Sequence, residues 1–99
     1  MILYNVTINV DPEVHDEWLR WMKEVHIPDV MSTGLFADSK IFRIHCEEDE
    51  EKTYSIQYFC KSMEDYEKYQ REHAPRLQQE HTTKYKDKFT AFRTILEEI

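Results

Sequence analysis

Hydrophobic residues alternate with polar ones at the start of the chain, over residues 2–10, and again over residues 53–60. A repeat of two positions, rich in β-branched and aromatic residues, is typical of strands that are covered on one side. Residues 37–46 and 88–96 have a similar composition, so we expect further strands there. The pattern therefore predicts four strands, separated by segments of a different periodicity.

The first of these intervening segments has helical spacing. Asp11 precedes Pro12, and this pair is typical of a helix start, because Asp caps the first turn and Pro needs no hydrogen bond there. The segment after them has one broad apolar face. The residues of this face are Val14, Trp18, Trp21, Met22 and Val25.

A proline and the only glycine of the chain mark the end of this helix. Pro28 disfavours the helical conformation at Ile27, so we expect the helix to end or kink there. A short turn over residues 28–33 should follow and stop at Gly34. His26 lies immediately before the break.

A second helix is predicted between the third and fourth strands. Ser62 is followed by acidic residues, which is typical of a capped helix start. The helical pattern extends to about Tyr85. Pro75 falls within it, so we expect a kink or restart near residues 73–74.

The predicted order β-α-β-β-α-β over residues 1–99 makes a single α+β domain with the ferredoxin-like fold, in which both helices cover one face of a four-stranded antiparallel sheet. The other face is left uncovered and is too apolar for water alone. It carries Leu3, Asn5, Ile41 or Phe42, Phe59, and Phe89 or Phe92. We expect a homodimer through this open face, which would form a dimeric α/β barrel.

Charge and composition exclude several classes of partner. The net charge is −7 and no basic stripe is present, so nucleic acid and anionic membranes are disfavoured. No apolar run approaches the roughly 20 residues of a membrane span. With no signal-peptide pattern, we expect a cytoplasmic protein. We also expect Cys46 and Cys60 to be free thiols, and the acidic run 47–51 to be a solvated hairpin tip.

Several segments together resemble an uncharacterised bacterial family that is known only as a domain of unknown function. The resemblance is carried by residues 1–7, 18–34, 54–59 and 72–77, and it covers nearly the whole chain. It implies a fold and no activity.

A looser resemblance, in fold and motif position, is to the dimeric α/β barrel superfamily. Its members include small cofactor-free monooxygenases, haem-degrading monooxygenases and proteins with a His-x-Pro element after the first helix, where this chain has His26-Ile27-Pro28. Asn5 and His73 match two positions that the haem-degrading members use. No predicted strand carries the Trp that those members also use, and we expect no cofactor.

The candidate site is placed around His26. We take His26 and His73 as candidate catalytic residues, because each lies beside a proline break and an imidazole exchanges protons near neutral pH. Candidate ligand-binding residues are Trp18, Trp21, Met22 and Tyr58. The alternative is structural, with His26 capping the end of the helix and the tryptophans in the core. His73 and His81 lie eight residues apart, about 12 Å along a helix, which is too far for one metal ion.

Two functions fit these observations. The first is a binding or interaction module whose main property is its dimer. The alternative is a small cofactor-free enzyme, similar to a monooxygenase or isomerase, that acts on an aromatic small molecule with His26 as acid or base and His73 as its helper. A cavity between helix and sheet that is reached by both of these imidazoles, His26 and His73, would favour the enzyme.

Overall fold

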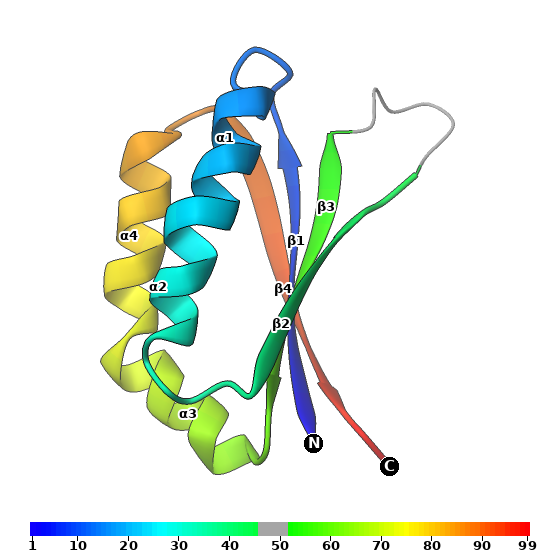
Figure 1. Cartoon of the computed structure of the whole chain (residues 1–99), viewed down its shortest axis with the longest axis vertical. Coiled ribbons are helices and arrows are strands. Elements are labelled where there is room, and N and C mark those ends of the chain that lie inside the picture. The colour runs from blue at the N-terminus through cyan, green and yellow to red at the C-terminus, as the bar shows by residue number, and fades with distance from the viewer. Residues whose placement is uncertain (46–51) are drawn as a thin grey trace.

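The computed structural model describes residues 1–45 and 52–99, which fold into a layer of helices packed against one sheet (Figure 1). Cys46 and the acidic run 47–51 lie outside the described residues. In chain order the elements are β1 (Ile2–Val10), α1 (His15–Trp21), the π-helical turn η1 (Met22–His26), α2 (Ile27–Met31), β2 (Asp38–Arg43), β3 (Thr53–Cys60), α3 (Met63–Glu72), α4 (Ala74–Lys84) and β4 (Phe89–Glu97).

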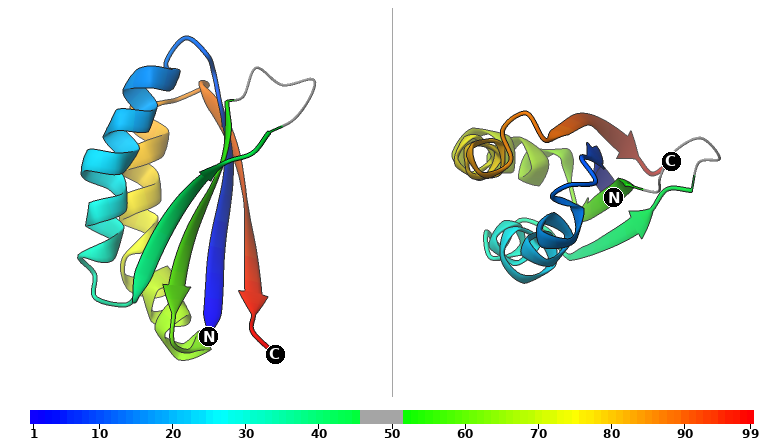
Figure 2. Two further views of the ribbon diagram at one scale, coloured as in Figure 1. Left: turned by 45° about the vertical axis from the view of Figure 1, so that its right-hand side comes forward. Right: turned by 90° about the horizontal axis from the view of Figure 1, so that it is seen from above.

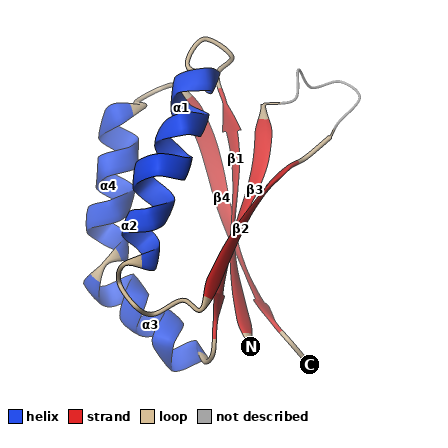
Figure 3. Cartoon of the chain, in the orientation of Figure 1, coloured by secondary structure: helices blue, strands red, loops and turns tan. Residues whose placement is uncertain are grey.

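The strands of the described residues form a four-stranded antiparallel sheet in the order β2-β3-β1-β4. All the helices lie on the same face of this sheet, as the two views of Figure 2 make clear and as the colouring by secondary structure shows in Figure 3. This is the ferredoxin-like arrangement that the order of predicted elements indicates, and the prediction of fold is confirmed.

Strand register decides which side chains face the helices. Val6 of β1 pairs with Ile56 of β3 and with Arg93 of β4, so these positions share the helix-covered face. The same alternation places Phe92 on the open face, where it is 63% exposed, and Phe89 on the helix side. On β2, Phe42 belongs to the open face and Ile41 to the covered one.

The first helix differs from its prediction at both ends. It begins at His15 and not at Asp11, because Asp11 uses its carboxylate to accept the backbone N–H of Glu13 in a turn. It also does not end at Ile27. The chain passes Pro28 without a stop, because a π-helical turn precedes it, in which the N–H of Ile27 donates to the carbonyl of Met22.

This wider turn decides which side chains face the sheet. In a regular α-helix each step of four residues rotates a side chain by about 40° relative to the last, so a row at this spacing drifts around the helix. A turn that contains an extra residue cancels part of this drift. As a result Trp18, Met22 and Val30 are all buried, and His26 lies in the same row of the helix. Val25, which the sequence places on the apolar face, is instead 41% exposed.

The second helical segment agrees with its prediction. Ser62 caps α3 by accepting the N–H of Asp65, and the helix breaks at His73 before α4 begins at Ala74, with Pro75 in its first turn. Gly34 has a positive φ of 79°, as a residue that stops α2 and turns the chain toward β2 should have. Cys60 is a buried free thiol. Among the described residues no helix has the length and apolar character needed to cross a membrane.

Candidate functional site

A cavity of about 40 Å³ lies between the helices and the covered face of the sheet. Its walls come from β1, β3, β4 and from the helices on both sides. Most of the wall is apolar or aromatic, and a few polar groups face it. The polar side chains in the wall include His26, His81, Arg93, Tyr58, Tyr69 and Gln78.

His26 enters this cavity from the π-helical turn. Its ring stacks on Trp21, with the ring centroids 5.1 Å apart. Its Nδ1 atom is buried and has no hydrogen-bond partner among the described residues. The pKa of His26 is lowered to about 4, mainly by burial; Asp29 partly opposes this shift, and the positive charge of Arg93 adds a smaller contribution to it. His26 is therefore a neutral imidazole at pH 7, with an unused nitrogen.

His81 of α4 lies next to His26 in the cavity. The two ring centroids are 5.7 Å apart and the rings meet edge to face. His81 is buried, and its Nε2 accepts the indole N–H of Trp18 at 2.9 Å. Burial lowers the pKa of His81 to about 4, helped by His26 and Arg93. The cavity thus brings together two neutral imidazoles from different helical segments.

Arg93 supplies the positive charge of the cavity. It lies on the helix-covered side of the edge strand β4, and its Nε donates to the hydroxyl of Tyr4 at 3.1 Å. In the described part of the chain no carboxylate forms an ion pair with its guanidinium. Because Arg93 is exposed and also lines the cavity, it connects the cavity with the surface along β4.

Two tyrosines complete the polar lining. Burial raises the pKa of Tyr58 and of Tyr69 well above the ordinary value, and the neighbouring tyrosines add to this effect. Both phenols therefore stay protonated at any physiological pH. They provide hydroxyl groups that donate or accept hydrogen bonds, and they carry no charge of their own.

The structure brings together some of the predicted site residues and separates others. Met22, Tyr58 and His26 line the cavity, and Trp21 packs on His26. Trp18 is fully buried and does not line the cavity, but its indole N–H donates the hydrogen bond to His81.

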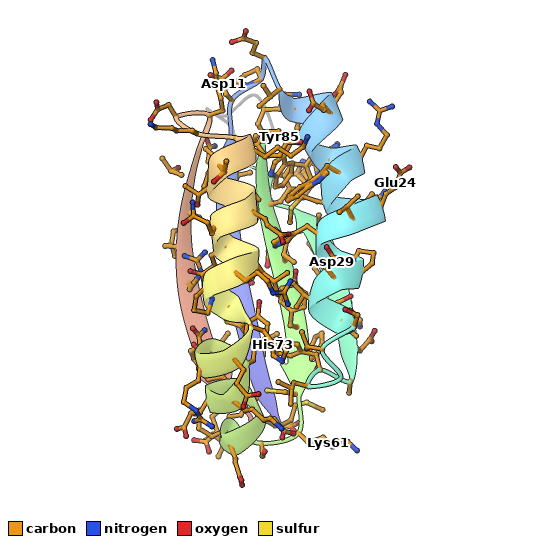
Figure 4. All side chains as sticks on the ribbon, turned by 90° about the vertical axis from the view of Figure 1, so that its left-hand side faces the viewer. Asp11, Glu24, Asp29, Lys61, His73 and Tyr85 are labelled. Carbon is orange, nitrogen blue, oxygen red and sulfur yellow. The ribbon has the colours of Figure 1, made fainter. Side chains whose placement is uncertain are left out.

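His73 lies elsewhere, at the junction of α3 and α4, with its ring 6.3 Å from that of Tyr69 (Figure 4). It does not line the cavity, and the imidazole beside His26 is that of His81.

Sequence reasoning missed Arg93, although a signal for it exists. Residues of β4 alternate between the two faces, and Phe89, Ala91 and Arg93 share the face that turns toward the helices. A cation at a position where an apolar residue is expected is unusual and points to a polar partner or a ligand. No comparable feature of the sequence indicates that His81 lies next to His26.

The arrangement provides for proton exchange next to a positive charge. A neutral imidazole accepts a proton at one nitrogen and donates one from the other, and a guanidinium stabilises negative charge that forms beside it. Within residues 1–45 and 52–99, no three His, Cys, Asp or Glu side chains converge as a metal site would require.

Solved structures of several proteins share this fold. An ethyl tert-butyl ether D (EthD) family protein from Bacillus halodurans C-125 is 18% identical, with a TM-score of 0.73 and the whole of both chains covered. A dimeric ferredoxin-like protein from an uncultured marine organism is 17% identical, with a TM-score of 0.73, covering 100% of this chain and 95% of its own. An antibiotic biosynthesis monooxygenase is 13% identical, with a TM-score of 0.65, covering 100% and 99%.

At these identities the likeness establishes the fold alone. No curated protein matches the chain at a significant level. The resemblance noted in the sequence, by contrast, extends over the entire chain, because the model of the family described as "Domain of unknown function (DUF4286)" matches residues 1–99. The chain therefore belongs to the DUF4286 family, whose members share a domain of unknown function.

Proposed function

We propose that this protein binds a small organic molecule in the cavity between its helices and sheet and exchanges a proton with it, without a cofactor. His26 is the proton acceptor and donor, and His81 is the neighbouring imidazole that takes the helper role first considered for His73. The observation that carries the proposal is the buried Nδ1 of His26, which has no hydrogen-bond partner among the described residues, in a cavity that His81 also lines. Monooxygenases occur among the proteins of the same fold, which is compatible with such a site.

The size of the cavity limits what enters it. Its volume of about 40 Å³ has room for roughly two or three water molecules, or for one small functional group. An aromatic ring therefore stays at the mouth, and only its reacting group reaches His26. In that pose His26 takes a proton from the carbon next to a carbonyl, and the C–H electrons form an enolate. The protonated imidazole exchanges this proton with solvent and then returns a solvent-derived proton to the same carbon, which restores the ketone and the neutral imidazole.

Phenylacetone tests this proposal, since it is aromatic, uncharged and enolisable. In D₂O the protein should speed deuterium uptake at the benzylic carbon, measured by NMR, by about 10²-fold or more over buffer. His26→Gln should lower the rate to that of buffer. His73→Gln is the matched control and should keep the activity, because His73 does not line the cavity.

Equal exchange rates for wild type, His26→Gln and buffer would contradict an enzyme. If phenylacetone then still shifted the imidazole signals of His26, the protein would be a binding module, which is the other function that the sequence suggests.

A second observation favours an interaction role in addition. The open face of the sheet exposes large apolar side chains, among them Phe42, Phe92 and Leu96, with exposed fractions of 49%, 63% and 46%. We propose that a second copy of the chain covers this face, which would give the dimer that the sequence predicts. Support also comes from similar structures that are themselves dimeric ferredoxin-like proteins.

Light scattering after size-exclusion chromatography at micromolar concentration tests the dimer. We expect twice the monomer mass for wild type and the monomer mass for Phe92→Asp, because a carboxylate on the open face would be buried without a partner. Val25→Asp places the same charge at an exposed apolar position on the helical side, and it should leave the dimer intact. A monomeric wild type would overturn the proposal.

A further inference from the structure

We propose that the molecule bound in the cavity is an organic anion, a carboxylate or an enolate, and that Arg93 is the residue that recognises its charged group. This inference rests on the proposed function, since it names the class of molecule that the His26 cavity takes. It is carried by the position of Arg93 on the covered face of the sheet and by the hydrogen-bonding groups that the fold leaves unused beside it.

The guanidinium of Arg93 has unused donors. Of its five N–H groups, the described residues engage only the one on Nε, which donates to the hydroxyl of Tyr4. Tyr4 is itself 1% exposed and buried in a cluster of aromatic rings, so this bond anchors the arginine at the cavity wall. The outer N–H groups form the planar fork that binds two oxygens of a carboxylate at once.

A second unused group lies in the same cavity. Nδ1 of His26 is buried and has no partner within the described part of the chain. A buried polar atom of this kind is costly unless a ligand or water meets it. A bound carboxylate offers acceptor oxygens both to the guanidinium and to a protonated imidazole nitrogen.

The charges around the cavity agree with this assignment. Arg93 lowers the pKa of both His26 and His81, so its positive charge reaches the two rings. Among the described residues, Asp29 is the one carboxylate that shifts the pKa of His26, and no carboxylate shifts the pKa of His81. An anion bound at Arg93 would offset its charge, which raises the pKa of His26 and makes it a better base when the ligand is present.

The volume of the cavity sets where the anion lies. A space of about 40 Å³ accommodates a carboxylate but not an aromatic ring, whose shape needs a cavity nearer to 150 Å³. The charged group of the ligand therefore enters between Arg93 and His26. The remainder extends toward the surface along β4, where Arg93 is exposed.

Two probes of the same shape and different charge test the inference. Phenylacetate and phenylacetamide are titrated into the protein at pH 7 and low salt, while NMR follows the imidazole signals of His26 and His81. We expect phenylacetate to bind about tenfold more tightly, because a charged acceptor forms the stronger bond with a guanidinium. Saturating phenylacetate should also raise the pKa of His26, a readout that is independent of activity.

Variants assign the effect to Arg93. Arg93→Gln should remove the preference for phenylacetate, whereas Arg71→Gln, an exposed arginine on α3, should leave it unchanged. Equal affinity of the wild type for both probes, or failure of both to bind, would overturn the inference. So would an equal loss in both arginine variants, which would indicate non-specific attraction by surface charge.

The proposed proton transfer and the proposed anion site can be contradicted independently of each other. If phenylacetate binds at Arg93 but deuterium exchange into phenylacetone does not depend on His26, the anion site stands and the proton-transfer function falls. If the exchange depends on His26 and the two phenyl probes bind equally, the function stands and the anion preference falls.

Discussion

The indole nitrogen of Trp18 donates a hydrogen bond to Nε2 of His81 at 2.9 Å, and both side chains are buried. This bond fixes the protonation of the imidazole. An Nε2 that accepts a hydrogen bond carries no proton, so neutral His81 has its proton on Nδ1. Protonation of His81 would destroy the acceptor, which agrees with its pKa of about 4.

Trp18→Phe should therefore release His81. We expect a loss of about 2–4 kcal/mol in the free energy of unfolding, from the cavity that remains and the unmet imidazole nitrogen. The pKa of His81 should rise, and the NMR signals of its ring should indicate a mixture of tautomers. Trp21→Phe on the same helical segment is the control, and there the tautomer of His81 should not change.

Acid should destabilise the protein in a defined range of pH. His26 and His81 have a native pKa of about 4 and an unfolded pKa near 6.5, so the unfolded state takes up protons first as the pH falls. Their stabilising effect is complete above pH 6.5 and is lost between pH 6.5 and 4, by roughly 3 kcal/mol at most for each imidazole. Urea unfolding at a series of pH values measures this loss.

His26→Gln should remove about half of this pH-dependent loss, since one of the two imidazoles is gone. His73→Gln should not change it, because His73 lies outside the cavity. A pH dependence that is identical in wild type and His26→Gln would show that other groups cause it.

Pro28 should control where His26 points. It has no N–H and its ring conflicts with the carbonyl four residues earlier, so it favours the wider π-helical turn before it. In Pro28→Ala we expect a regular α-helix through this region, with His26 rotated away from His81 and its pKa closer to 6.5. NMR titration of His26 measures this change.

Pro75→Ala is the matched control for that experiment. Pro75 lies in the first turn of α4, where a helix needs no N–H at that position, and His26 should keep its pKa. If Pro28→Ala also leaves His26 unchanged, packing against the sheet and not the proline maintains the π-helical turn.

Tyr54, at the start of β3 and outside the cavity, should contribute to the stability of the protein. Its buried hydroxyl bonds to Nε2 of His15 and accepts from Arg43, and His15 in turn contacts Asp16. Tyr54→Phe removes these bonds and leaves Nε2 of His15 without this partner, so we expect the free energy of unfolding, measured in urea, to fall by about 1–3 kcal/mol.

Tyr66→Phe is the comparison for Tyr54→Phe. Tyr66 is only half-buried and its hydroxyl is bonded to Gln70 alone among the described residues, so the loss in the free energy of unfolding should be smaller than for Tyr54→Phe. Equal losses in the two variants would mean that the network of His15 and Tyr54 adds no stability.

Much of the fold follows from local patterns in the sequence. The repeat of two positions predicts which residues of β1 and β3 face the helices, because successive side chains of a strand point to opposite faces. Gly34 and Pro75 end or restart helices where the sequence predicts it, since both act on their own backbone. The sequence also singles out His26 as a candidate site residue, from its place beside a proline.

Tertiary structure alone decided what surrounds His26. The π-helical turn selects His26 over Val25 for the interior, and this depends on how the row from Trp18 to Val30 packs on the sheet. The packing of α4 beside η1 then places His81, and not His73, next to His26. The register of β4 adds Arg93. Periodicity assigns a residue to a face of its own element, whereas contacts between elements depend on distances across the core that no local pattern contains.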